Sequence, residues 1–327
     1  MTRFWIPAVH RGGRAAAALL AASAALTLAA CSAPAGARPA AAPPAHRSPG
    51  SPDPAPTSAL AALTARRPGP RYYLALGDSL AIGIQPDLAG VSRPTTAGYP
   101  SQLNALLRRH GARLRLVALG CSGETTGTML HGGRCRYPRG SQLAQAVTFL
   151  RAHPGAVPLI TIDIGANDPS SCLRAHGVGA MLGCVNSATS AALRQLGTIL
   201  GRLRTAAGPG ALIVGMTYYV PELAAWGRGS GGTGLAVLAD SMVAGLDRQL
   251  AAVYRRHGAR VADVFGAFAS ADVTGRVRLA GRAVPPNVAD ICLLTWMCAP
   301  APRGPNVHAT TAGYRVIARA FWRAITG

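Results

Sequence analysis

The sequence predicts a three-layer α/β/α domain built on a central, mostly parallel sheet of five strands. Apolar, strand-length runs alternate along the chain with helix-length segments, as in folds made of right-handed crossovers. Most of these runs are nearly continuous in apolar residues, which is typical of strands covered on both faces. Of the 327 residues, 49% are hydrophobic, so a sizeable core is possible.

The expected elements follow one another from residue 71 to the end of the chain. Strands are expected at residues 72–76, 113–118, 159–164, 211–216 and 260–264. Helices are expected at residues 99–110, 142–152, 188–206, 236–257 and 311–325. Irregular stretches at 119–140, 165–186, 217–235 and 265–310 separate them, and long loops at strand ends usually carry function.

The amino terminus predicts export. Arg3, Arg11 and Arg14 precede an uncharged apolar stretch over residues 15–30, which is short for a membrane span and fits a secretory signal. The stretch ends in Leu-Ala-Ala-Cys at residues 28–31, which resembles the bacterial lipobox. We therefore expect residues 1–30 to be a signal peptide and Cys31 to carry a lipid that anchors the protein outside the cell membrane. Secretion without a lipid is the alternative.

Residues 31–70 are rich in Ala, Pro, Ser and Arg and have no apolar period. This composition predicts a disordered, semi-extended linker. One domain is then expected over residues 71–327.

The formal charge is +21, from 33 basic and 12 acidic residues, and every basic residue is arginine. The arginines are scattered, and no helix carries a basic stripe with interleaved aromatic residues, so no nucleic-acid partner is expected. Abundant arginine, alanine, glycine and proline fit a GC-rich genome.

Seven cysteines are present, and assigning Cys31 to lipid leaves six. These fall into sequence-local pairs, although six cysteines allow 15 connectivities and the sequence alone leaves the pairing open. Disulfides are reasonable in an exported chain. A metal site is disfavoured because no C-x-x-C spacing occurs. The pairs are Cys121/Cys135, Cys172/Cys184 and Cys292/Cys298.

Four short blocks follow strands or open helices, so all can meet at one edge of a parallel sheet. They are Gly-Asp-Ser-Leu at 77–80, Gly-Cys-Ser-Gly-Glu-Thr-Thr at 120–126, Gly-Ala-Asn-Asp at 165–168, and His308 before the last expected helix. A serine needs a base to act as a nucleophile, and an ester's tetrahedral intermediate needs preorganised donors. The candidate nucleophile and base are Ser79 and His308. The candidate donors to the oxyanion are the Ser79 and Gly123 N–H groups and the Asn167 amide.

Together, the four blocks resemble those of the SGNH hydrolase superfamily, the GDSL esterases and lipases. The resemblance spans residues 71–327 and implies a flavodoxin-like fold, Ser79 as nucleophile, His308 as base, and Gly123 and Asn167 in the oxyanion hole. Residues 121–126 and 295–298, with the three-disulfide layout, further resemble secreted actinobacterial members. No G-x-S-x-G elbow is present, which argues against the α/β-hydrolase fold.

One position departs from the family pattern. The family usually has an aspartate three residues before the histidine, where this chain has Pro305. A main-chain carbonyl of Pro305 or Asn306 is the first candidate to orient the His308 ring, as in family members with a Ser-His dyad. Another side chain, such as that of the more distant Asp290, is the second candidate, and impaired catalysis is the third possibility.

Three acidic residues near the blocks are expected to have structural rather than catalytic roles. Asp78 is expected to cap its turn, Asp163 to be a satisfied strand acid, and Glu124 to cap a helix start.

The sequence thus predicts a monomeric serine esterase or lipase that acts on an ester or lipid substrate, with no metal or organic cofactor. Two alternatives remain. One is a non-catalytic envelope lipoprotein that binds an acylated glycan or lipid; the other is a carbohydrate O-deacetylase or thioesterase.

Overall fold

The computed structural model describes residues 58–174, 176–226 and 228–327. The expected signal peptide, Cys31 and most of the expected linker lie outside the described residues.

A five-stranded, all-parallel sheet forms the centre of the domain, with the order β4-β1-β5-β6-β7. In chain order this is second, first, third, fourth and fifth, the flavodoxin-like arrangement, so the predicted fold class is confirmed. The strands are β1 (Tyr72–Gly77), β4 (Arg115–Ala118), β5 (Leu159–Asp163), β6 (Leu212–Met216) and β7 (Arg260–Ala262).

The inner strands β1, β5 and β6 are covered on both faces, which explains their apolar sequences. From the second residue onward, every residue of β1 is buried, and all of β5 is buried. In the register, Tyr73 lies between Leu116 of β4 and Leu159 of β5.

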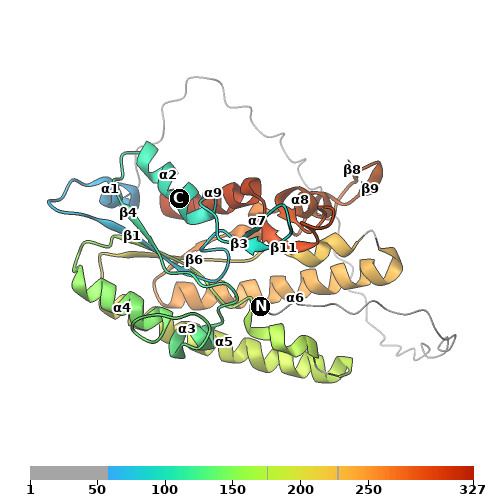
Figure 1. Ribbon diagram of the computed structural model, residues 1–327, viewed down its shortest axis with the longest axis horizontal. Helices are drawn as coiled ribbons and strands as arrows, with labels where there is room; N and C mark the ends of the chain where they lie inside the picture. The colour runs from blue at the N-terminus through green and yellow to red at the C-terminus, as the bar shows by residue number, and fades with distance from the viewer. Residues whose placement is uncertain (1–57, 175, 227) are drawn as a thin grey trace, which may run out of the picture. The chain divides into compact units, whose positions relative to one another are not determined.

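Helices cover both faces of the sheet (Figure 1). On one side, α9 (Thr311–Thr326) packs against α1 (Ser58–Thr64) and α2 (Tyr99–Arg109). On the other, α5 (Val178–Ala207) packs against α4 (Gln142–Ala152) and α6 (Gly229–Arg256).

The pairing of α2 with α9 follows from their apolar spacing. Tyr99, Leu103 and Leu107 recur every four residues and are fully buried. The ring of Tyr99 stacks on that of Phe321, with centroids 4.6 Å apart.

The ordered domain begins earlier than expected, so the prediction of a disordered linker up to residue 70 is wrong for residues 58–64. These form α1, whose Leu63 is buried in the core. The guanidinium of Arg71 donates to the carbonyls of Ala62, Leu63 and Ala65 at 2.7–2.9 Å. The Ala-rich composition concealed a helix that tertiary contacts stabilise.

Helices α5 and α6 also begin earlier than predicted. The first turns of α5 are tied by the Cys172–Cys184 disulfide to a 3₁₀ helix at Asp168–Arg174. The start of α6 is rich in glycine, which has low helix propensity and so conceals a helix from sequence patterns.

Shorter elements lie between the main strands and helices, most of them in the stretches expected to be irregular. Two disulfides brace such stretches, Cys121–Cys135 and Cys292–Cys298. The helices are α3 (Thr126–His131), α7 (Val264–Ala267), α8 (Pro286–Leu294) and a 3₁₀ turn at Pro221–Ala225. The strand pairs are β2 (Gln85–Pro86) with β3 (Ser92–Arg93), β8 (Val277–Leu279) with β9 (Arg282–Val284), and β10 (Thr295–Trp296) with β11 (Asn306–Ala309).

Over the residues that the structure describes, no helix is long and apolar enough to span a membrane.

Candidate active site

The strand order reverses between β1 and β5, and in open α/β sheets ligands bind beyond the carboxyl ends of strands at such a point. The Gly-Asp-Ser turn follows β1, and Asn167 follows β5. Close strand packing requires the glycine: Gly77 has φ +138°, and a Cβ there would lie 2.5 Å from the Asp163 Cγ. The backbone therefore leaves β1 at a position that only glycine can occupy.

The Asp78 side chain organises the turn that carries Ser79. Its Oδ1 accepts from the Leu80 N–H at 2.9 Å and from the Ser79 hydroxyl at 3.5 Å. Its Oδ2 accepts from the Asn167 amide at 3.2 Å, which links the β1 and β5 loops. Burial raises the pKa of Asp78 to about 6. The capping role expected of Asp78 matches this geometry.

A buried polar cluster lies beneath this turn. Asp163 is fully buried, and its Oδ1 accepts from the Tyr99 hydroxyl at 2.6 Å. Burial and the nearby charge of Asp78 raise the pKa of Asp163 well above its usual range. Burial and the charge of Asp78 therefore disfavour a second negative charge in this cluster.

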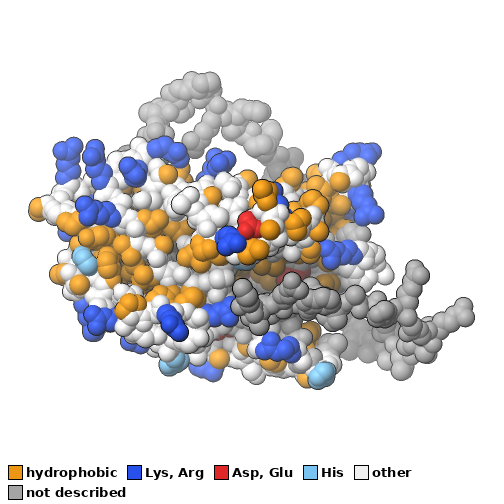
Figure 2. Space-filling model, in the orientation of Figure 1, with side chains coloured by type: hydrophobic (Ala, Val, Ile, Leu, Met, Phe, Trp, Pro, Cys, Tyr) orange, Lys and Arg blue, Asp and Glu red, His pale blue; other side chains and the backbone are white. Residues whose placement is uncertain are grey.

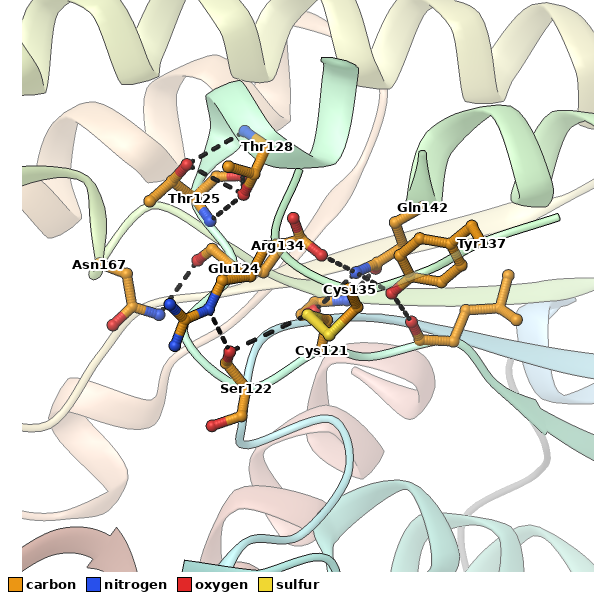
Figure 3. The surroundings of a disulfide bond; sticks show 12 residues. Cys121, Ser122, Glu124, Thr125, Thr128, Arg134, Cys135, Tyr137, Gln142 and Asn167 are labelled. Carbon is orange, nitrogen blue, oxygen red and sulfur yellow. Dashed lines mark hydrogen bonds between the residues drawn. A yellow bond between two sulfur atoms is a disulfide. The ribbon is translucent and has the colours of Figure 1, made fainter. Parts of the chain in front are cut away.

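The loop that contains Gly123 is braced on both sides (Figure 3). Cys121 is linked to Cys135, and the amide of the buried Gln142 donates to both the Glu124 Oε2 (3.0 Å) and the Gly77 carbonyl (2.9 Å). Gly123 itself has φ +75°, in the left-handed region that favours glycine.

Glu124 does not cap a helix, contrary to expectation. The cap of α3 is Thr125, whose hydroxyl accepts from the Thr128 N–H. Glu124 is instead buried against Gln142, and burial raises the pKa of its carboxyl.

Two backbone donors at this edge are unused. Among the described residues, neither the Ser79 N–H nor the Gly123 N–H has a hydrogen-bond acceptor. The Asn167 amide differs, because its two N–H groups donate to the Asp78 Oδ2 and to the Glu124 carbonyl (3.0 Å). Donation from Asn167 to a substrate would replace one of these bonds.

His308 lies on β11, just before α9. Its Nδ1 is 2.7 Å from the side-chain Oδ1 of Asn306, which also accepts from the His308 backbone N–H at 3.0 Å. The expectation of a main-chain carbonyl from Pro305 or Asn306 is therefore corrected: the ring's partner is the Asn306 side chain. Among the described residues, Asp290 makes no hydrogen bond to the ring.

This contact determines the tautomer of His308. The Asn306 oxygen accepts from a backbone N–H, and the Asn306 Nδ2 donates to the Ser92 hydroxyl at 3.0 Å, so the amide orientation is defined. An amide oxygen only accepts, so Nδ1 must carry the proton and Nε2 keeps its lone pair. Burial lowers the pKa of His308 to about 4, so the ring is neutral at neutral pH.

The backbone of β11 is held from two directions. Trp296 of β10 pairs with Asn306, in the segment closed by the Cys292–Cys298 disulfide. The buried Tyr219, which stacks on Phe268, donates its hydroxyl to the Val307 carbonyl at 2.8 Å. The segment around His308 is thus fixed although it lies outside the main sheet.

Ser79 and His308 make no hydrogen bond to each other in this structure, and the Ser79 hydroxyl is turned toward Asp78. Catalytic hydrogen bonds are often long or poorly aligned without substrate.

In the described part of the chain, no group of three His, Cys, Asp or Glu side chains is arranged to hold a metal ion.

The blocks found in the sequence mark Ser79, Gly123 and Asn167, but other contributors have no local signal. Gln142, Tyr99 and Tyr219 act through contacts with residues distant in sequence. Arg134, whose Nε donates to the Ser122 carbonyl beside Gly123, also lies in no motif; the neighbouring Cys121–Cys135 pair is the sequence feature that points to its loop.

The parallel sheet, with its serine turn after the first strand and its histidine before the last helix, defines the chain as an SGNH hydrolase. The model of the GDSL-like lipase/acylhydrolase family matches residues 75–316, and the chain belongs to that family. It is therefore a carboxylic ester hydrolase, an enzyme of ester or lipid substrates. No curated protein matches the chain in sequence.

The chain is similar to several solved structures. The lipase Lip_vut3 from a goat rumen metagenome has a TM-score of 0.51 and 19% identity, covering 79% of this chain and 98% of its own. The extracellular lipase of Streptomyces rimosus has a TM-score of 0.49 and 22% identity, covering 78% and 99%. Phospholipase A1 of Streptomyces albidoflavus NA297 has a TM-score of 0.47 and 20% identity, covering 78% and 100%.

Proposed function

We propose that the protein is a serine esterase that hydrolyses carboxylic esters through an acyl-enzyme on Ser79, with His308 as the base. The observation that carries this proposal is the contact between His308 Nδ1 and Asn306 Oδ1, which leaves Nε2 unprotonated and available. A neutral ring with a free Nε2 is the state that general-base catalysis requires.

In the first half of the reaction, Ser79 Oγ attacks the ester carbonyl carbon and its proton passes to His308 Nε2. Negative charge develops on the carbonyl oxygen, where the unused Ser79 and Gly123 N–H groups and the Asn167 amide donate. The C–O bond to the alcohol then breaks, and the alcohol leaves with the proton from His308.

In the second half, His308 takes a proton from water, and the resulting hydroxide attacks the acyl carbon. The acid is released and Ser79 recovers its proton. The Asn306 oxygen supports the imidazolium through a neutral dipole, where a triad would use a carboxylate.

The test combines turnover with covalent trapping. Wild type, Ser79→Ala and His308→Ala are compared on p-nitrophenyl esters of graded acyl length, with Ser171→Ala, an exposed serine, as the matched control. A fluorophosphonate probe should label the Ser79 peptide in wild type and in the control. Equal ester release by wild type and Ser79→Ala would contradict the proposal and favour a non-catalytic binding protein; release confined to acetyl esters would favour a deacetylase.

The proposed location is the outer side of the cell membrane, with Cys31 lipidated. The lipobox-like residues 28–31 support this, and three disulfides fit an exported protein. Intact mass of the membrane-fraction protein should show a diacylglyceryl group on Cys31. A soluble product that lacks Cys31 would contradict lipid anchoring.

A further inference from the structure

The guanidinium of Arg134 lies against the loop that carries Gly123. Its Nε donates to the Ser122 carbonyl at 2.8 Å. A Cβ built on Gly123 would lie 2.8 Å from the Arg134 Cζ and 2.9 Å from its Nε, so the guanidinium fills the space of the absent side chain. Figure 3 shows the guanidinium on the side of the loop that faces Asn167. Arg134 is therefore next to Gly123, one of the residues proposed to bind the oxyanion.

The covalent structure keeps Arg134 at this place. The next residue, Cys135, is bonded to Cys121, two residues before Gly123. The disulfide thus closes a 14-residue separation and holds the base of the arginine side chain beside the loop.

The hydrogen-bonding capacity of this arginine is largely unused. Within the described residues, only Nε of Arg134 is bonded, and the two Nη groups have no acceptor. The nearby Glu124 does not form an ion pair with it; the described residues contain a single ion pair, Arg93–Asp87. A positive, planar group with free N–H donors therefore borders the proposed oxyanion hole.

We propose that Arg134 binds a negatively charged group of the substrate, a carboxylate or a phosphate, close to the scissile ester. This inference rests on the proposed function. When the carbonyl oxygen of an ester accepts from the Gly123 N–H, the groups nearest to that carbonyl lie beside Arg134. A guanidinium presents N–H groups in a fork that matches a carboxylate or phosphate in two-point contacts. The preferred substrates are then anionic esters.

The overall charge of +21 attracts anions to the whole surface, so its effect must be distinguished from that of a local binding site. Figure 2 shows arginines spread over the visible face rather than gathered in one patch. Arg136 provides the matched control, because it is exposed on the same loop and carries no hydrogen bond in the described structure. Removing either arginine changes the net charge by the same amount.

The test uses pairs of esters that differ only in charge. The alcohol side is probed with 3-acetoxybenzoate against 3-acetoxybenzamide, and the acyl side with monoethyl succinate against ethyl succinamate. The measured quantity is the ratio of kcat/KM for the anionic ester to kcat/KM for its neutral partner, at low and high salt, in wild type, Arg134→Gln, Arg134→Lys and Arg136→Gln.

We expect wild type to favour the anionic member of at least one pair, and Arg134→Gln to lower that ratio about tenfold, as for loss of a charged hydrogen bond. The ratio for Arg134→Lys should lie between those of wild type and Arg134→Gln, and Arg136→Gln should keep the wild-type ratio. A kcat/KM ratio near one in wild type would overturn the inference, and so would equal losses in Arg134→Gln and Arg136→Gln. In either case, hydrolysis of the neutral esters would still support the proposed function. Hydrolysis of neither member would overturn the proposed function itself.

Discussion

The Asn306 side-chain oxygen lies 2.7 Å from His308 Nδ1, in the place where the family usually supplies a carboxylate three residues before the histidine. The substitute comes from two residues before, and it is neutral. It fixes the direction of the ring as a carboxylate does but adds no charge to stabilise an imidazolium. Two consequences for catalysis follow from this difference.

The first concerns loss of the amide. Asn306→Ala removes the acceptor for Nδ1 and for the His308 backbone N–H, so the ring is no longer held in one tautomer. We expect kcat/KM for a p-nitrophenyl ester to fall about 10–100-fold, as when a partner that orients a functional histidine is lost. Asn306→Gln, with an amide displaced by one methylene, should also be impaired. Full activity in Asn306→Ala would show that the ring is held by other contacts.

The second concerns pH. Burial lowers the pKa of His308 to about 4, and only the neutral ring is a base, so the acid limb of kcat/KM should lie near pH 4. Asn306→Asp places a carboxylate beside Nδ1, which favours the charged ring and should move that limb upward by about 1–3 units. The measurement is a kcat/KM profile from pH 3 to 9, with circular dichroism to confirm folding. An acid limb that is identical in both proteins would contradict the assignment of His308 as the base.

Much of the fold was predictable because its signals are local. Apolar runs in the sequence predict the strands β1 and β5. The amphipathic spacing of apolar residues predicts the helices α2 and α9, and the positions of these elements along the chain follow directly. The start of α5 was not predictable, since a disulfide and tertiary packing stabilise it in a stretch without helical periodicity. Helix α1 was missed because its composition resembles that of the linker before it.

The residues of the candidate site also divide into those with a local sequence signal and those without one. Ser79 and Asn167 lie in short motifs at strand ends and can be found from sequence. The role of the Asn306 side chain depends on a local turn of β11, in which one amide oxygen reaches both the ring and the backbone of His308. A sequence shows which residues are near in the chain but not which of their oxygen atoms faces the ring.

Asn167 offers a test of the oxyanion hole. Asn167→Asp keeps the shape but replaces the amide donors with a carboxylate that repels both the oxyanion and Asp78. We expect kcat to fall at least about 10²–10³-fold, the usual cost of losing one such donor. The amide also bonds Asp78 and the Glu124 carbonyl, so thermal unfolding of the variant separates a folding defect from a catalytic one. A stable variant with wild-type kcat would remove Asn167 from the mechanism.

Asp247 of α6 gives a prediction about stability. It is buried, its Oδ1 accepts from the Tyr218 N–H at 2.9 Å, and its Oδ2 has no partner among the described residues. Burial, with the charge of Asp263, raises its pKa to about 8. Between its usual range and about pH 8 the folded state holds a proton that the unfolded state lacks, so stability falls as pH rises through this window.

Asp247→Asn should remove that part of the pH dependence, because the amide keeps the Oδ1 acceptor and does not ionise. We expect the Tm of wild type to decline more steeply between pH 5 and 8 than that of the variant. Asp272→Asn, at an exposed aspartate, is the control and should follow wild type. Parallel Tm curves for all three proteins would show that Asp247 is not protonated in the folded state.

Arg71 connects α1 to the domain, and this connection tests where the folded unit begins. Its guanidinium donates to three carbonyls at the end of α1, whose Leu63 is buried in the core. Arg71→Met keeps an apolar stem but leaves these carbonyls without their charged donor. We expect a loss of about 2–3 kcal/mol in the free energy of unfolding, measured with urea, in line with hydrogen bonds to charged groups. Arg71→Lys should lose less, because an ammonium retains the charge and some of the bonds. A change below about 0.5 kcal/mol in Arg71→Met, the range of ordinary surface substitutions, would mean that the Arg71 hydrogen bonds do not stabilise the attachment of α1.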